Sequence, residues 1–186
     1  MLSYYYNMNN EEIKYGQSKF KNIGGVTCYI NSILTILQNC PIFSDYIVTG
    51  QFSKIIIENN KNDPIKLLDY ISYQFYQIIK GSLENDDYKI TPTSFKKTMG
   101  KKNPMWNNNQ QDSQEFFSFL ITCLEEEICD KVIFIPGKNI NKNNVIDTKL
   151  SILRINAQKS WEKYIKNEFS PLKLMFTGME YSKQEC

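Results

Sequence analysis

Apolar residues at helical spacing are the feature that most constrains how this chain can fold. Within residues 27–39 the apolar positions recur at i, i+3, i+4 and i+7, which lines one face of an α-helix. These positions are Ile30, Ile33, Leu34 and Leu37. Pro41 stands just beyond this stretch and favours an end of the helix there, because proline lacks a backbone donor.

Two longer stretches show the same spacing, so the sequence predicts a mainly α fold. Residues 63–80 carry an apolar stripe, with Pro64 at the first helical position and Gly81 just after the end, as helix ends favour. Residues 112–128 carry another stripe, and Asp112 is a good N-cap for it. The weaker predictions are short helices at 42–48, near 91–95 and at 160–167, loops at 104–111 and 136–148, a strand at 131–136 and an extended segment at 172–181.

Composition and charge narrow the class of protein. The chain has 186 residues, of which 41% are hydrophobic, enough apolar material for a folded core. Its net charge is +2, and the charges are mixed, unlike the basic patches of nucleic-acid-binding proteins. No apolar run approaches the ~18 residues of a membrane span, and the N-terminus lacks an apolar signal region. We therefore expect an intracellular protein, cytoplasmic or nuclear (in the host cell if the source is viral), with no nucleic-acid or membrane partner.

One cysteine stands where a nucleophile would be placed. The chain has five cysteines, which an intracellular location keeps reduced: Cys28, Cys40, Cys123, Cys129 and Cys186. Cys28 follows Gly24, Gly25 and Thr27 at the predicted start of a helix, where the helix dipole favours a thiolate. Backbone N–H groups at such a turn also stabilise an oxyanion. A buried structural cysteine is the alternative interpretation. The chain contains no histidine, the usual general base for such a thiol.

Three segments match a known family in the right order. Residues 21–34 read Lys-Asn-Ile-Gly-Gly-Val-Thr-Cys-Tyr-Ile-Asn-Ser-Ile-Leu, and residues 110–117 read Gln-Gln-Asp-Ser-Gln-Glu-Phe-Phe. The third set consists of Trp161, Ser170, Phe176, Gly178, Ser182 and Cys186. Together they closely resemble the conserved blocks of the ubiquitin-specific proteases, which are papain-like cysteine peptidases that remove ubiquitin from proteins.

The resemblance implies roles for particular residues. Cys28 matches the nucleophile of the family. Asp112 matches the carboxylate that binds the C-terminal tail of ubiquitin, with Gln111 and Gln114 beside it, although helix capping explains Asp112 as well. Trp161 is interpreted as a core residue. No cofactor is implied.

One departure from the family lies next to the nucleophile. The family usually has an asparagine five residues before the cysteine, where it donates a hydrogen bond to the oxyanion, and here that position is Ile23. Asn22 stands six residues before Cys28. Two interpretations stay open: Asn22 reaches the oxyanion through a longer loop, or backbone groups alone stabilise it.

The resemblance covers the N-terminal half of the family's catalytic domain, the helical thumb of a papain-like α+β peptidase, with the palm and fingers largely missing. We expect a polar lead-in of loose structure at residues 1–20 and the truncated protease domain at residues 21–186. Cys186 matches the first cysteine of a zinc pair in the fingers, and one thiol does not make a structural zinc site.

Three functions follow as hypotheses. The first is a deubiquitinating thiol protease that acts on ubiquitin or ubiquitinated proteins, with its other half in an adjacent reading frame, a second polypeptide or a continuation of this one. Without a histidine, the chain alone is expected to be inactive. The second is a non-catalytic remnant or decoy that binds the ubiquitin tail. The third is an unrelated helical interaction domain.

Overall fold

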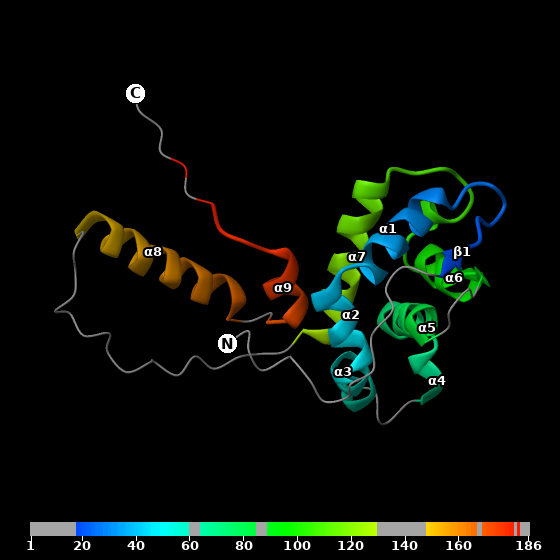
Figure 1. Cartoon of the computed structure of the whole chain (residues 1–186), viewed down its shortest axis with the longest axis horizontal. Coiled ribbons are helices and arrows are strands. Elements are labelled where there is room, and N and C mark those ends of the chain that lie inside the picture. Colours follow the sequence, from blue (N-terminus) through cyan, green and yellow to red (C-terminus); the bar gives the residue numbers. More distant parts are fainter. Residues whose placement is uncertain are drawn as a thin grey trace. The chain divides into compact units, whose positions relative to one another are not determined.

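The computed structural model describes residues 18–59, 64–84, 89–129, 148–166, 169–180 and 182. The chain divides into two compact units, Met1–Leu120 and Ile121–Cys186. Helices make up most of the described residues, and the mainly α fold class is confirmed (Figure 1).

The first unit contains most of the secondary structure. Its elements are β1 (Lys19–Phe20), α1 (Cys28–Gln38), α2 (Pro41–Val48), α3 (Gln51–Asn59), α4 (Pro64–Leu67), α5 (Ile71–Glu84), β2 (Lys89–Ile90), α6 (Thr93–Lys102), the 3-10 helix η2 (Pro104–Trp106) and the start of α7 (Ser113–Ile128). The second unit contains the end of α7, α8 (Thr148–Ile165) and α9 (Pro171–Phe176).

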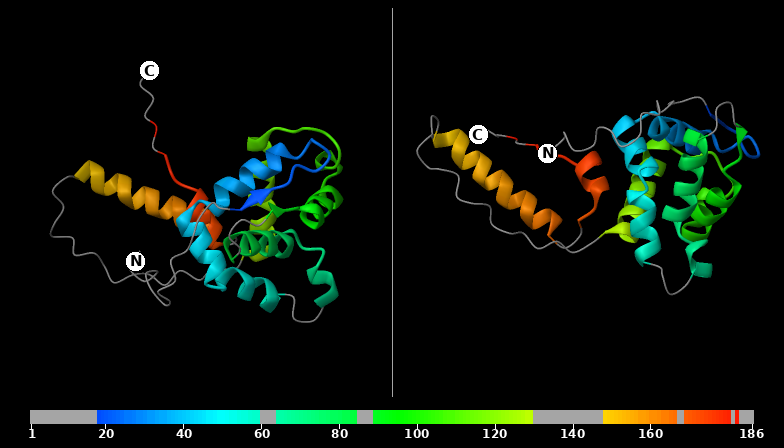
Figure 2. Two further views of the ribbon diagram at one scale, coloured as in Figure 1. Left: turned by 45° about the vertical axis from the view of Figure 1, so that its right-hand side comes forward. Right: turned by 60° about the horizontal axis from the view of Figure 1, so that its bottom comes forward.

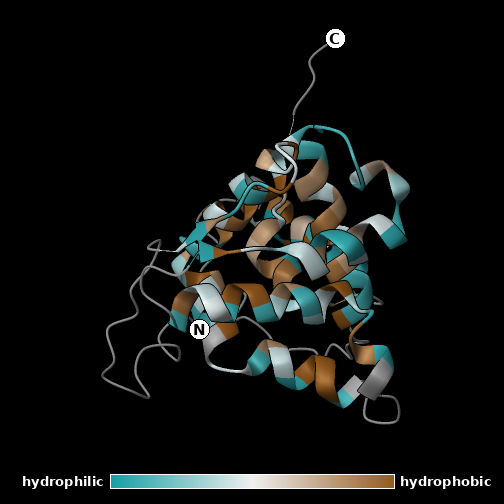
Figure 3. Ribbon diagram, turned by 90° about the vertical axis from the view of Figure 1, so that its right-hand side faces the viewer, coloured by the Kyte–Doolittle hydropathy of each residue, from teal (hydrophilic) through white to brown (hydrophobic). Residues whose placement is uncertain are grey.

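The predicted apolar face of α1 is the buried face of the helix. Ile30, Ile33, Leu34 and Leu37 are all nearly inaccessible to solvent. The helix ends at Gln38, and Pro41 occupies the first turn of α2, where its missing N–H costs nothing. Colouring by hydropathy shows hydrophobic and hydrophilic segments alternating along the helical ribbons, as one-sided burial requires (Figure 3).

Phe75 of α5 lies at the centre of the aromatic core of the first unit. Its ring centroid is 5.7 Å from that of Phe43, 6.5 Å from that of Phe52 and 6.0 Å from that of Phe95. These three rings belong to α2, α3 and α6, so one side chain joins four helices. In Figure 2, α3 and α5 run side by side, in agreement with their contacts.

A short parallel sheet lies beside α1. Lys19 pairs with Lys89, and Phe20 pairs with Ile90. Two side-chain amides of α1 hold β1 in place. Asn31 Nδ2 donates to the carbonyl oxygen of Phe20 at 3.1 Å, and Gln38 Nε2 donates to that of Ser18 at 3.2 Å.

This strand corrects one prediction. Residues 18–20 are ordered rather than loose, because pairing with β2 and the amides of α1 satisfy their backbone groups. Residues 1–17 lie outside the described part of the chain, and the domain boundary at residue 20 stays a prediction.

The predicted helix at residues 63–80 is two helices. The structure has α4 and α5 there, with Leu68, Asp69 and Tyr70 outside both. Apolar spacing continues across this break, so periodicity alone did not reveal it. The helix α3 was not predicted, and Trp106 of the predicted loop 104–111 lies in η2.

The second unit differs most from the sequence prediction. The helix predicted at 160–167 is the end of the 18-residue α8, which begins at Thr148. The segment predicted as extended at 172–181 begins with α9 instead. Ser170 accepts a hydrogen bond from the backbone N–H of Lys173 at 3.1 Å, and Pro171 stands in the first turn. Those are helix-starting signals.

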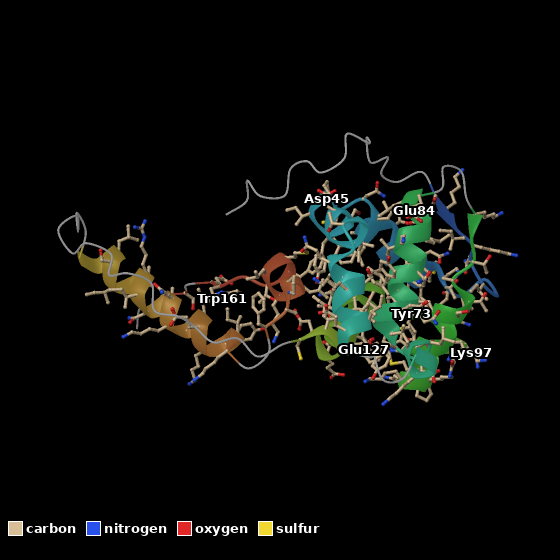
Figure 4. All side chains as sticks on the ribbon, turned by 90° about the horizontal axis from the view of Figure 1, so that it is seen from below. Asp45, Tyr73, Glu84, Lys97, Glu127 and Trp161 are labelled. Atoms are coloured by element: carbon tan, nitrogen blue, oxygen red, sulfur yellow. The ribbon has the colours of Figure 1, made fainter. Side chains whose placement is uncertain are left out.

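Further predictions concern Trp161, the segment 131–136 and Cys186. Trp161 of α8 (Figure 4) is half-buried rather than a core residue. Its ring centroid lies 5.7 Å from that of Tyr164. The predicted strand at 131–136 lies outside the described residues, as does Cys186. In the part of the chain that the structure describes, no helix is long and apolar enough to cross a membrane.

Candidate active site

A tight turn leads from β1 into the helix that begins with Cys28. Gly24 and Gly25 have φ of 62° and 75°, and the N–H of Val26 donates to the carbonyl oxygen of Ile23 at 3.3 Å. Positive φ at both central residues defines a type I′ turn, which favours glycine strongly. The Gly-Gly pair is therefore needed for the backbone conformation of this loop.

We expect Gly25→Ala to lower the free energy of unfolding by about 1–2 kcal/mol, because an L-residue at positive φ is strained. No atom lies within 4 Å of the position that the added Cβ would take, so the cost is conformational rather than steric. Chemical denaturation measures it. The matched control is Gly81→Ala in α5, which also has open space and is expected to gain up to about 1 kcal/mol from helix propensity. Equal effects at the two positions would contradict the strained turn.

Cys28 is exposed and is the first residue of α1. The preceding Thr27 makes no side-chain cap to the helix, since its hydroxyl is used in the loop. The backbone N–H groups of the first turn therefore have no partner from the N-cap side chain. The thiol of Cys28 is therefore exposed beside the uncapped N-terminus of α1.

The side chain of Asn22 closes the loop onto the residue before Cys28. Its Oδ1 accepts a hydrogen bond from the N–H of Thr27 at 2.8 Å and another from the hydroxyl of Thr27 at 3.1 Å. The hydroxyl in turn accepts from the N–H of Ile23 at 2.8 Å. The longer loop thus folds back so that the Asn22 amide adjoins the start of α1.

The second matched segment, residues 110–117, leads into α7 and includes its first turn. Asp112 is exposed, and its Oδ1 accepts hydrogen bonds from the N–H groups of Gln114 at 2.8 Å and Glu115 at 3.0 Å. The predicted N-cap is therefore confirmed. Gln111 Nε2 donates to the carbonyl oxygen of Met105 at 3.0 Å, which ties this segment to η2, and the side chain of Gln114 is exposed.

An aromatic cluster brings the two blocks together. The ring of Phe116 in α7 lies 5.2 Å from that of Tyr29 and 5.3 Å from that of Trp106, both nearly edge-on. Tyr29 follows Cys28 directly, and its hydroxyl donates to the carbonyl oxygen of Trp106 at 3.3 Å. Burial raises the pKa of Tyr29 above its ordinary value, and the nearby charge of Cys28 adds to this. The cluster fixes the start of α1 against η2 and the start of α7.

Sequence reasoning missed two residues of this region. Thr27 was expected only as part of the helix, yet it holds the loop. Trp106 was expected in a polar loop, yet it is 1% exposed. The sequence contained signals for both residues. A Thr hydroxyl beside a Gly-Gly turn favours a hydrogen bond within the loop, and a lone Trp among polar residues favours burial of its ring. Among the described residues, no group of three or more His, Cys, Asp or Glu side chains could hold a metal ion.

Comparison with known proteins matches most of the chain to one family. The family described as ubiquitin carboxyl-terminal hydrolase matches residues 18–186. The chain belongs to this family. The match begins at Ser18, directly before β1, and so includes both blocks that the aromatic cluster joins.

Several members of the ubiquitin carboxyl-terminal hydrolase family are similar to almost the whole chain. Ubiquitin carboxyl-terminal hydrolase 12 of Saccharomyces cerevisiae is 30% identical over 99% of this chain and 15% of its own length. Human ubiquitin carboxyl-terminal hydrolase 15 is 27% identical over 96% of this chain and 17% of its own length. The probable ubiquitin carboxyl-terminal hydrolase 1 of Schizosaccharomyces pombe is 27% identical over 95% of this chain and 20% of its length. The chain thus spans about a fifth or less of these relatives.

Proposed function

We propose that this chain carries the nucleophile of a thiol deubiquitinase and that Cys28 is that nucleophile. The observation that supports this best is the exposed thiol at the start of α1, where the helix N-terminus and the Asn22 loop meet. The names of the relatives supply the substrate class, which is ubiquitin or ubiquitinated proteins. An intracellular location fits such a substrate.

The proposed reaction is acyl transfer. The Cys28 thiolate attacks the carbonyl carbon of the last glycine of ubiquitin, and the C–N bond breaks as the amine leaves with a proton. The oxyanion formed on the way would accept hydrogen bonds from the N–H of Cys28 and from Asn22 Nδ2. Water then hydrolyses the thioester. The 186 residues include no histidine, so a general base has to come from outside them, for instance from a second polypeptide.

Asp112, Gln111 and Gln114 are proposed to bind the ubiquitin tail. Asp112 and the side chain of Gln114 are exposed, and the aromatic cluster fixes their segment relative to Cys28. One oxygen of Asp112 caps α7, and a carboxylate has a second oxygen to offer a ligand. The two roles of Asp112 are therefore compatible. Cys186 is proposed as a zinc ligand only together with further cysteines.

A non-catalytic role in binding the ubiquitin tail is the second candidate, and the absence of histidine favours it. Thioester exchange separates the two without needing a base, because a thiolate attacks a ubiquitin thioester and displaces a thiolate. We expect ubiquitin carrying a C-terminal mercaptoethanesulfonate thioester to acylate Cys28 roughly tenfold faster than Cys129, a preference of about 1.4 kcal/mol. Non-reducing gels and peptide mass spectrometry measure the adduct.

Matched variants serve as controls for the thioester exchange. Cys28→Ala should remove most of the adduct and leave only the slow labelling of Cys129. Cys129→Ala, which removes a half-buried thiol, should leave the adduct at Cys28 unchanged. Asp112→Asn keeps a capping oxygen but removes the charge, so a slower exchange at unchanged stability supports the tail-binding role. Equal labelling of Cys28 and Cys129 in the wild-type chain would refute the assignment of Cys28 and leave tail binding alone.

A further inference from the structure

Thr27 stands between the loop and the nucleophile, and its hydroxyl group both donates and accepts a hydrogen bond within the loop. It donates to Asn22 Oδ1 at 3.1 Å and accepts from the N–H of Ile23 at 2.8 Å. The residue is 0% exposed. A threonine in this place would ordinarily cap the helix with its hydroxyl, and here it does not. Its hydroxyl therefore serves the loop rather than the helix.

The two hydrogen bonds that Asn22 Oδ1 accepts determine the orientation of its amide. A primary amide has one acceptor end and one donor end. Both bonds from Thr27, through its N–H and its hydroxyl, hold the acceptor end. If the amide turned over, the backbone N–H of Thr27 would face the donor end, and its hydrogen bond at 2.8 Å would be lost. The donor end, Nδ2, is thereby directed away from Thr27.

The loop between Asn22 and Cys28 needs a contact that orients the Asn22 amide, because it is one residue longer than the spacing usual in the family. Asn22 lies six residues before Cys28, and a tight turn at Gly24 and Gly25 takes up the intervening chain. Asn22 is itself exposed, so packing around its side chain does not hold the amide. The hydrogen bonds to Thr27 are part-buried, because Thr27 itself is 0% exposed.

We infer that Thr27 is a positioning residue, which orients the Asn22 amide so that Nδ2 donates to the oxyanion formed at Cys28. This inference rests on the proposed function of Cys28 and Asn22. Thr27 touches neither the substrate nor the reacting atoms in this scheme. It acts through Asn22, and it lets a loop one residue longer than usual keep the asparagine donor.

Two reactions of the Cys28 thiol separate the effect of the Asn22 orientation on the oxyanion from the reactivity of the thiol itself. Acylation of Cys28 by p-nitrophenyl acetate forms an S–C bond to the carbonyl, passes through an oxyanion and expels nitrophenolate, and the thiol proton goes to solvent. Alkylation by iodoacetamide displaces iodide and forms no oxyanion. The ratio of the two rates, measured on the Cys28 peptide by mass spectrometry above pH 8, reports oxyanion stabilisation and cancels the thiolate fraction. Neither reaction needs a histidine.

Thr27→Val is expected to lower this ratio by roughly tenfold, less than the 100- to 1000-fold cost of deleting an oxyanion donor in a complete enzyme. Thr27→Ser keeps the hydroxyl and should retain the wild-type ratio. Thr27→Ala, which lacks the hydroxyl but is smaller, replaces Thr27→Val if valine prevents folding. The matched control is Thr35→Val in α1. The hydroxyl of Thr35 donates to the carbonyl oxygen of Asn31 at 2.8 Å, outside the loop.

The outcomes distinguish this inference from the proposed function. Asn22→Ala should lower the ratio as much as Thr27→Val or more, and adding Thr27→Val to it should change nothing further, because both act through one amide. A low ratio in Asn22→Ala with a wild-type ratio in Thr27→Val overturns the role of Thr27 and keeps Asn22 as donor. Unchanged ratios in both remove the donor role as well. Additive losses, or equal losses in acylation and alkylation, also overturn the inference.

Discussion

The isolated 186-residue chain is expected to turn over a fluorogenic ubiquitin substrate about four to six decades more slowly than an enzyme with a complete catalytic set. The reason is that these residues contain no histidine. A thiol is a weak nucleophile unless an adjacent general base activates it. In a complete catalytic set, a histidine would also return a proton to the leaving amine.

Added imidazole tests this explanation directly. If Cys28 is a competent nucleophile that lacks only a base, imidazole should raise the rate for the wild-type chain and leave Cys28→Ala at background. The increase should follow the concentration of neutral imidazole. Efficient turnover without any added base, abolished by Cys28→Ala, would contradict the expectation and require a base among the existing residues.

Phe116→Ala is expected to lower the free energy of unfolding of the chain by about 3–5 kcal/mol. Phe116 is 0% exposed, and its ring contacts Tyr29, Trp106 and also Phe95, whose centroid is 6.4 Å away. Truncation leaves a cavity at the point where α1, α6, η2 and α7 meet. Because small domains are stable by only about 5–15 kcal/mol, the loss is a large part of the total. Chemical denaturation measures it.

Phe119→Ala is the matched control, one turn further along α7. Phe119 is half-buried, and its ring contacts that of Trp106 at 5.4 Å. Its truncation should therefore cost clearly less than that of Phe116. A second readout is the selectivity of thioester exchange at Cys28, which should fall in Phe116→Ala where the variant still folds. Equal destabilisation by both variants would show that the cluster does not connect the two blocks as described.

Local signals in the sequence predicted some elements well. The helix after Cys28 and the N-cap at Asp112 are encoded within one turn of chain, by apolar spacing and by a short side chain that reaches two backbone N–H groups. The break between α4 and α5 was not visible, because the apolar stripe continues through it. The start of α9 carries Ser170 and Pro171, and the prediction of an extended segment overlooked these signals.

The mainly helical class, the family and the candidate nucleophile can be predicted from the amino-acid sequence, because each depends on short segments whose residues are close together in the chain. The orientation of Asn22 cannot be predicted in this way. Its orientation depends on a turn with two residues at positive φ and on the hydroxyl of Thr27. Likewise, the position of the Cys28 segment relative to the Asp112 segment depends on ring contacts between α1, η2 and α7. Contacts between residues 77 or more positions apart leave no periodic pattern in a sequence, because packing rather than spacing selects them.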